Sequence, residues 1–371
     1  MAVQILPSRP AASGLSTDSI SELPTSTTKY YPAFDYLRLV LAIVVAAGHS
    51  ELILWDASGN YAVQIFFALS GWLIGGNLLQ ARASDLPRFY FYRAARIWTP
   101  YFAAIILLMA ASLLKENITA KWLEIFSYDA TFVYNIFGPL QLALYKDAMP
   151  LQGTGNHFWS ICAEEQFYLL SPILITLLPL NIGKSIAFWL LIVVGVSLSV
   201  FWGYFGSISL GVLAAVLQSR FGDWHSTQGA RVALGLASAL GFVAVYAGYV
   251  DYGVGAPLSA ICIVLFLAQE GPRLHFAAFL GGISYPMYLN HWIGVFAANS
   301  VFAKLAMRDT LICKVSGVVL AIAVAILLYL AIDRNVQKLR ARYFTVFRGR
   351  VVAVLGYLLV ACGILIGTTL A

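Results

Sequence analysis

The sequence has little charge. Only 11% of its 371 residues are Asp, Glu, Lys or Arg, whereas 60% are hydrophobic and the mean hydropathy is +0.81. Soluble globular domains carry about 25% charged residues. A water-soluble chain of this length could not bury so much apolar surface in its core. The composition therefore excludes an ordinary soluble domain and predicts an integral membrane protein.

Cysteine is also scarce, and two common hydrolase motifs are absent from the sequence. The four cysteines are not arranged as CxxC pairs, which argues against a disulfide framework and a cysteine metal site. We expect them to be buried small hydrophobes, and we predict no metal site. Neither GxSxG nor HExxH occurs, which argues against a lipase or a zinc peptidase. The net charge of +6 comes from basic residues in short loops, a topology signal rather than a nucleic-acid site.

Long, continuous apolar runs are what the chain has instead. In lipid, backbone polar groups must be satisfied within the protein, so runs of this length predict helices. The expected fold is all-α, a polytopic helical bundle with about ten core spans and one extra C-terminal span. The spans are expected at 36–54, 61–80, 98–114, 166–180, 185–202, 204–219, 231–249, 254–269, 278–302, 311–332 and 351–370.

The distribution of Lys and Arg predicts the orientation. With a cytoplasmic N-terminus, all but six of the 23 Lys and Arg fall on the cytoplasmic side, as the positive-inside rule requires. Residues 1–31 are rich in Ser, Thr, Pro and Ala and are expected to be a disordered cytoplasmic tail. The aromatic outer segment 115–165 is either a functional loop or part of an interfacial aromatic belt.

Arg38 and His49 are polar residues in the first predicted span. Charged groups within spans are costly and often mark function. Eleven residues at about 100° each bring both side chains to one helix face, ~16 Å apart along the axis. A lone intramembrane His is often only a packing residue, but the shared face with Arg38 favours a functional role.

Two further clusters flank the next spans. Arg93 and Arg96 share one face of a helical turn just before the third span, where they suit a phosphate ligand or act simply as topology signals. Glu164 and Glu165 lie at the outer end of the fourth span, after Trp159. One of them could orient a catalytic His, or both could be acids at a solvated helix start.

The ninth span carries a fourth cluster. Ser284, Tyr288 and His291 recur on one helix face, and Pro286 interrupts the hydrogen bonding of that helix. We expect this polar face to line a cavity or a helix interface.

Together these blocks resemble the membrane-bound acyltransferase-3 family. Arg38 and His49 match its Arg-x10-His motif, Arg93 and Arg96 its RxxR motif, and residues 63–74 its FFxLSG block. Residues 159–168 match its WS…EEQFY block, and 284–291 its SYxxYLxH block. The chain departs from the family at Gln64, often acidic there, and at 333–335, often Glu-Arg-Pro. The resemblance divides the chain into an acyltransferase-3-like transmembrane domain at 32–335 and, at 336–371, a basic cytoplasmic loop with an extra helix.

The resemblance implies an enzyme of the bacterial inner membrane. It would move an acyl group, acetyl by expectation, from cytoplasmic acyl-CoA to a hydroxyl of a surface polysaccharide or a lipid-linked oligosaccharide. No tightly bound cofactor is implied. By this resemblance His49 is the base or the acyl carrier, and Glu164 or Glu165 orients it. The expected CoA-binding residues are Arg38, Arg93 and Arg96, and the expected acceptor-binding residues are Trp159, Ser284, Tyr285, Tyr288 and His291.

A transporter or flippase of glycan precursors is the main alternative. It too would need intramembrane charges. Transporters often consist of two similar halves, but the second half of this chain repeats neither the Arg38–His49 pattern nor the Glu164-Glu165 pair. A structural subunit of a glycan-assembly complex is a third possibility, and it would not need His49.

Overall fold

The structure is a computed structural model that describes residues 29–139 and 145–370, so most of the predicted tail at 1–31 lies outside the described residues. Every regular element in the described part is a helix. The longer helices are α1 (Pro32–His49), α2 (Ser58–Gln80), α3 (Leu86–Ser112), α7 (Trp159–Pro172), α8 (Ile186–Ser197), α9 (Trp202–Phe221), α10 (Gln228–Tyr246), α11 (Tyr252–Leu267), α12 (His275–Lys304), α13 (Leu311–Leu328), α14 (Arg334–Tyr343) and α15 (Val346–Leu370). Shorter elements include α4 (Ala120–Ala130), α5 (Tyr134–Phe137), the 3-10 segment η3 (Pro150–Phe158) and the π-helical turn η7 (Tyr329–Asp333).

The helices confirm the predicted all-α membrane protein. Six helical segments of the described chain are long and apolar enough to cross a membrane. They include α1, α2, α10 and α15, as well as the longer segments that contain α3 and α13. Each of the eleven predicted spans overlaps one helix of the structure, although several of these helices are shorter or more polar than a full span. The number of crossings, the domain boundaries and the cytoplasmic N-terminus stay predictions.

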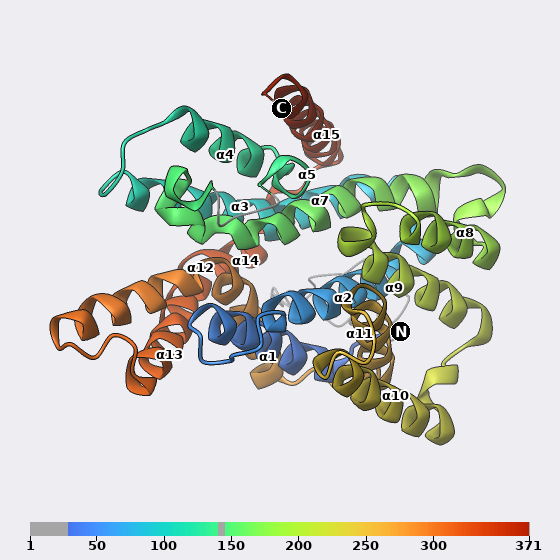
Figure 1. Cartoon of the computed structure of the whole chain (residues 1–371). Coiled ribbons are helices and arrows are strands. Elements are labelled where there is room, and N and C mark those ends of the chain that lie inside the picture. The colour runs from blue at the N-terminus through green and yellow to red at the C-terminus, as the bar shows by residue number, and fades with distance from the viewer. Residues whose placement is uncertain (1–28, 140–144, 371) are drawn as a thin grey trace, which may run out of the picture.

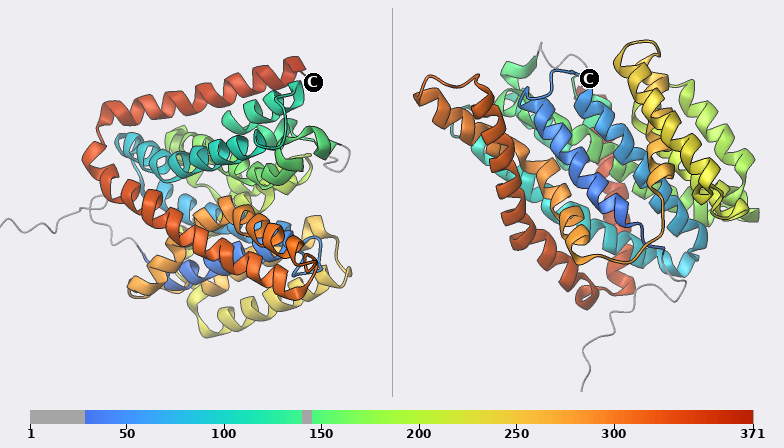
Figure 2. Two further views of the ribbon diagram at one scale, coloured as in Figure 1. Left: turned by 90° about the vertical axis from the view of Figure 1, so that its left-hand side faces the viewer. Right: turned by 90° about the horizontal axis from the view of Figure 1, so that it is seen from below.

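Helices distant in sequence pack side by side. α1 lies between α2 and α12, α2 also contacts α9 and α11, and α12 pairs with α13 along its length. α3 packs against α7 and α15. The α1–α2 loop and the α12–α13 turn both lie toward the left end of the bundle in Figure 1. Figure 2 shows α15 running along one side of the molecule.

Two helices begin well before the predicted membrane spans that they contain. The third span was expected from residue 98, but α3 begins at Leu86, so Arg93 and Arg96 lie within a continuous helix. The fourth was expected from residue 166, but α7 begins at Trp159. In both cases charged residues interrupt the apolar run without interrupting the helix, because Arg and Glu are good helix formers.

α2 and α9 approach each other at small residues. Gly71 and Gly75 of α2 face Gly211 and Ala215 of α9. A Cβ atom added at Gly71 would collide with the backbone carbonyl of Ile208. Small residues four apart allow this close backbone approach between membrane helices.

We therefore predict that Gly71→Ala destabilises the protein, because the α2 and α9 backbones would have to separate. Overpacking of this kind costs about 1–3 kcal/mol. Gly76→Ala is the matched control, since nothing lies within 4 Å of a Cβ built there. The measurement is the thermal midpoint of the detergent-solubilised protein, followed by size-exclusion fluorescence. Equal midpoints for the two variants would refute the close crossing.

α15 packs into the same bundle. Its glycines face other helices: Gly349 lies against Pro87, Gly356 against Leu169 and Gly363 against Thr131. The hydroxyl of Tyr357 donates to the carbonyl of Leu169 at 2.7 Å. The predicted boundary at 335/336 falls inside α14, which continues directly from η7.

Candidate functional site

α1 carries Arg38 and His49 at its two ends. The Arg38 guanidinium binds the carboxylate of Asp35, one turn earlier, at 3.0 Å. Tyr30 donates to the same carboxylate. The chain before α1 therefore fixes Arg38, a residue whose side chain is only 20% exposed.

The three predicted CoA-binding arginines gather in one region. Arg38 lies within electrostatic reach of both Arg93 and Arg96, although the residues come from α1 and α3. The guanidinium of Arg93 lies 5.2 Å from the ring centroid of Tyr168 on α7. All three arginines are only partly exposed. Asp35 offsets part of this positive charge, and three guanidinium groups held close together suit a polyanionic ligand.

A polar face of α7 continues from the arginines into the bundle. Ser160, Glu164 and Tyr168 are spaced four residues apart and so share one face over ~12 Å. Glu164 accepts hydrogen bonds from the hydroxyls of Ser70 and Tyr168. Because Arg93 stacks on Tyr168, this line of side chains joins the arginine cluster to the interior.

The expected contact of Glu164 or Glu165 with His49 was wrong. Glu164 is bound by Ser70 and Tyr168, and Glu165 accepts a hydrogen bond from the Trp98 indole at 2.8 Å. Both carboxylates lie inside α7 rather than at a solvated helix start, and Glu165 is 3% exposed. The early start of α7 places them more than one helical turn from its first residue, Trp159, which lines the cavity beside His49. Whether either carboxylate acts in catalysis stays a prediction.

His291 on α12 is the partner of His49. The distance from His49 Nδ1 to His291 Nε2 is 2.7 Å. His291 is buried, and its Nδ1 lies 2.9 Å from the carbonyl oxygen of Tyr288. A carbonyl only accepts, so His291 carries its proton on Nδ1 and accepts on Nε2. His49 must then carry its proton on Nδ1, which leaves its Nε2 with a free lone pair.

A third histidine, His157, joins this pair. Its ring centroid lies 4.8 Å from that of His291 and 6.1 Å from that of His49. It belongs to η3, where Leu151, Gln152 and Gly153 adopt left-handed conformations that turn the chain sharply before α7. Sequence analysis missed His157, because no periodicity or motif marks it. Its place directly before the Trp159-Ser160 block was the only available signal.

Tyr288 links the histidines to α7. Its hydroxyl donates to the carbonyl of His157 at 2.9 Å and lies 2.5 Å from the hydroxyl of Ser160. Both Tyr288 and Ser160 are buried. The polar face of α7 thus ends at the histidine cluster, and polar side chains run from the arginines to His49.

A cavity of about 440 Å³ opens beside His49. Its walls come from the end of α1, the α1–α2 loop, the start of α2 and the junction of η3 with α7. This volume falls within the ~300–1,000 Å³ typical of small-ligand sites. The side chains that carry polar or aromatic groups into it are His49, Glu51, Trp55, Asp56, Ser58, Asn60, Asn156, His157, Trp159 and Tyr288.

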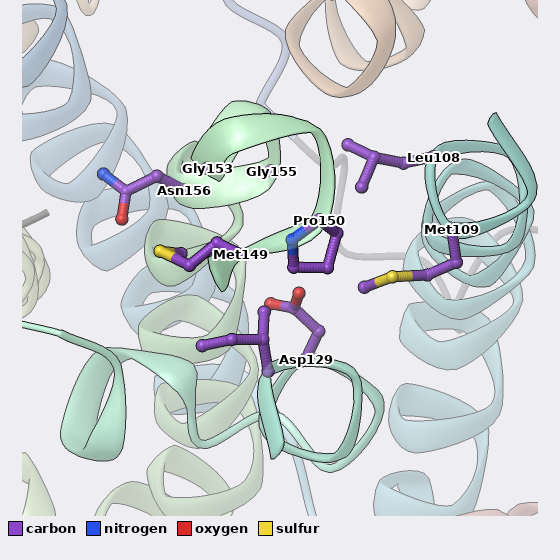
Figure 3. Close-up of a pocket in the computed structure, with 9 residues that line it drawn as sticks. Leu108, Met109, Asp129, Met149, Pro150, Gly153, Gly155 and Asn156 are labelled. Carbon is purple, nitrogen blue, oxygen red and sulfur yellow. The ribbon is translucent and has the colours of Figure 1, made fainter. Parts of the chain in front are cut away.

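A second void lies between α3, α4 and η3. It measures about 10 Å³ and is lined by Asp129, Met149 and Pro150, among others (Figure 3). In that view the Asp129 carboxylate points toward Pro150. A void of about this size has room for one water molecule. The cavity at His49, rather than this void, is therefore the candidate substrate site.

The predicted acceptor residues divide between the cavity and its surroundings. Trp159 and Tyr288 line the cavity, while His291 lies behind His49. Ser284 donates to the carbonyl of Gly281 in its own helix, and Tyr285 donates to the carbonyl of Ile97 on α3. Neither residue lines the cavity. Each hydroxyl thus already has a carbonyl partner, and whether either residue binds the acceptor stays a prediction.

Gln64, where the resemblance often has an acid, also has a structural contact. It is buried, and its amide donates to the carbonyl of Gly203 at 2.8 Å while its carbonyl accepts from Ser207 at 2.5 Å. The side chain thereby joins α2 to α9.

Comparison with known proteins agrees with this geometry. The sequence model of a family described as an acyltransferase domain, acyltransferase-3, matches residues 31–330. The chain belongs to the acyltransferase-3 family. The match covers α1 to α13, which includes both arginine motifs, the three clustered histidines and the cavity at His49.

Several curated acyltransferases are similar to part of this chain. The peptidoglycan O-acetyltransferase OatA of Listeria monocytogenes is 30% identical over 153 residues, 39% of this chain and 24% of the relative. A putative O-acetyltransferase of Staphylococcus aureus strain COL is 28% identical over 196 residues, 50% of this chain and 30% of the relative. The matched region thus spans less than a third of either relative. No solved structure matches the chain.

Proposed function

We propose that this protein is a membrane-bound, acyl-CoA-dependent O-acetyltransferase of a carbohydrate. The observation that carries the proposal is the line of polar side chains from the arginine cluster to His49. It connects a site for a polyanion with a cavity large enough for a sugar. O-acetyltransferases among the relatives support the acetyl group, and one relative named for peptidoglycan supports a glycan acceptor.

The donor binds at the arginine end. Arg38, Arg93 and Arg96 hold the phosphates of CoA, since guanidinium groups bind phosphate in a bidentate manner. The pantetheine arm then extends past Tyr168, Glu164 and Ser160 toward the histidines. The predicted topology places the arginines on the cytoplasmic side, where acyl-CoA is found.

The acyl transfer takes place at the free Nε2 of His49. In one route Nε2 removes the proton from an acceptor hydroxyl, and the hydroxyl oxygen attacks the thioester carbonyl. The carbon–sulfur bond breaks, and the CoA thiolate takes the proton back from the imidazolium. In the other route Nε2 attacks the thioester carbonyl, the carbon–sulfur bond breaks and CoA leaves as the thiolate. The acyl-histidine then passes the acyl group to the sugar hydroxyl, whose proton neutralises the thiolate, and neutral His49 is restored. Both routes need the tautomer that His291 imposes.

Label transfer tests the proposal. Membranes containing the protein are incubated with radiolabelled acetyl-CoA and the glycan fraction of the host, and label in the glycan is counted. We expect transfer that depends on His49. If no acyl-CoA supports His49-dependent transfer or CoA release, and the membranes instead move a lipid-linked glycan, the transporter alternative replaces this proposal.

Arg96→Ala is expected to raise the KM for acetyl-CoA by about 10- to 100-fold, because a charge-assisted hydrogen bond contributes about 1.5–3 kcal/mol. The change in kcat should be smaller, since the guanidinium binds far from the reacting carbonyl. Arg342→Ala is the matched control, an exposed arginine of α14. An unchanged KM in Arg96→Ala would rule out its role in binding phosphate.

A further inference from the structure

The line of polar side chains from the arginine cluster to His49 has differently charged groups at its two ends. The donor end gathers three arginines, one of them paired with Asp35, whereas the cavity at His49 has two carboxylates, Glu51 and Asp56, among its lining residues. None of the residues that line this cavity is Lys or Arg. From this asymmetry we infer that the outer cavity selects acceptors that are neutral or cationic and rejects anionic glycans. The inference rests on the proposed function and adds the charge class of the acceptor.

The loop between α1 and α2 carries both carboxylates. Helix α1 ends in a left-handed turn at Glu51, with φ of 56°, and the amide of Leu52 bonds back to the carbonyl of Ala47. This is the pattern of a Schellman helix end, which fixes where the following residues lie. Lys314 binds the Glu51 carboxylate at 3.2 Å, so the charge of Glu51 is partly neutralised.

Asp56 contributes the charge that is not neutralised. It is exposed, and in the part of the chain that the structure describes it has neither an ion-pair nor a hydrogen-bond partner. Asp56 lies just before the N-terminus of α2, where the helix dipole alone would favour an acidic residue. However, no side chain caps the start of α2, so the carboxylate of Asp56 stays available to the cavity.

The rest of the cavity suits an uncharged sugar. Trp55 and Trp159 supply aromatic surface for the apolar face of a sugar ring, and Asn60 and Asn156 supply hydrogen-bond donors and acceptors for hydroxyls. Trp55 is held rigidly because its ring packs against Tyr61, with ring centroids 5.5 Å apart. An anionic sugar in the same place would be repelled by Asp56, while the neighbouring cation, Lys314, is already bound to the Glu51 carboxylate.

The test compares two acceptors of equal length, a neutral N-acetylglucosamine oligomer and the same oligomer bearing carboxylates. Binding is followed by tryptophan fluorescence, which does not require catalysis, and transfer from labelled acetyl-CoA is followed in parallel. We expect wild-type protein to prefer the neutral oligomer by about tenfold or more at low salt. Asp56→Asn should reduce this preference by about tenfold, through tighter binding of the anionic oligomer.

Asp309→Asn is the matched control, since Asp309 is an exposed acid of the α12–α13 turn that does not line the cavity. It should leave the preference unchanged. Equal binding of both oligomers to wild type, binding of neither, or no effect of Asp56→Asn would overturn the inference. Selective binding of the neutral oligomer without any acyl transfer would support the inference and refute the proposed function instead.

Discussion

His49→Gln is expected to reduce acyl transfer by about a thousandfold or more, while the protein still folds. General base catalysis contributes about 10²–10⁴-fold, and loss of a covalent carrier has an effect at least as large. Glutamine keeps a polar group of similar size at the cavity wall, so packing around α1 should change little. The rate is measured as labelled acetyl transfer in membranes at saturating donor and acceptor.

The control for His49 is another histidine. His275 lies exposed at the start of α12, outside the cavity, and His275→Gln should keep full activity. Rapid denaturation at neutral pH during turnover, which spares an acid-labile acyl-imidazole, separates the two routes. A labelled protein adduct that disappears in His49→Gln identifies an acyl-histidine, whereas CoA release without an adduct supports the base. Wild-type rates in His49→Gln would remove His49 from the mechanism.

Much of the fold follows from the sequence because lipid allows few alternatives. A backbone in the hydrocarbon region must be helical or closed into a barrel, so each long apolar run identifies a helix. The same reasoning does not give the full length of α3, which begins at Leu86 although the predicted span begins at residue 98. An apolar run ends at the first charged residues, such as Arg96, but a helix whose charged face lies against other helices continues past them.

The candidate site was only partly predictable. Helical spacing placed Arg38 and His49 on one face and separated them along α1, because both positions depend only on local geometry. The partner of His49 could not be found in that way. His291 lies 242 residues away along the chain, and its contact depends on how α1 packs against α12.

The same limit explains why neither Glu164 nor Glu165 contacts His49, as had been expected. A carboxylate is the usual partner of a catalytic histidine, so an acidic pair at a membrane boundary was a reasonable candidate. The start of α7 at Trp159 places Glu164 against Ser70 and Glu165 against Trp98 instead. Chemistry predicted the kind of group, but only the packing of α7 against α2 and α3 decides what that group contacts.

His291→Phe is expected to lower kcat by about 100-fold with little change in either KM. Phenylalanine retains an aromatic ring in the buried position but removes the acceptor for the Nδ1 proton of His49. Without that acceptor, His49 also populates the tautomer with the proton on Nε2, which neither removes a proton nor attacks a thioester. In catalytic triads, loss of the correct histidine tautomer reduces kcat by up to about 10⁴-fold.

His291→Gln separates orientation from packing. The glutamine side-chain oxygen can accept from His49, so this variant should regain part of the activity that phenylalanine loses. Both variants need thermal midpoints near that of wild type, because His291 is only 2% exposed and a misfolded protein would also be inactive. Recovery by glutamine but not by phenylalanine identifies the hydrogen bond from His49 as the functional feature. Full activity in His291→Phe would mean that His49 keeps its tautomer without His291, and the orienting role would then have to be sought in other residues, such as His157.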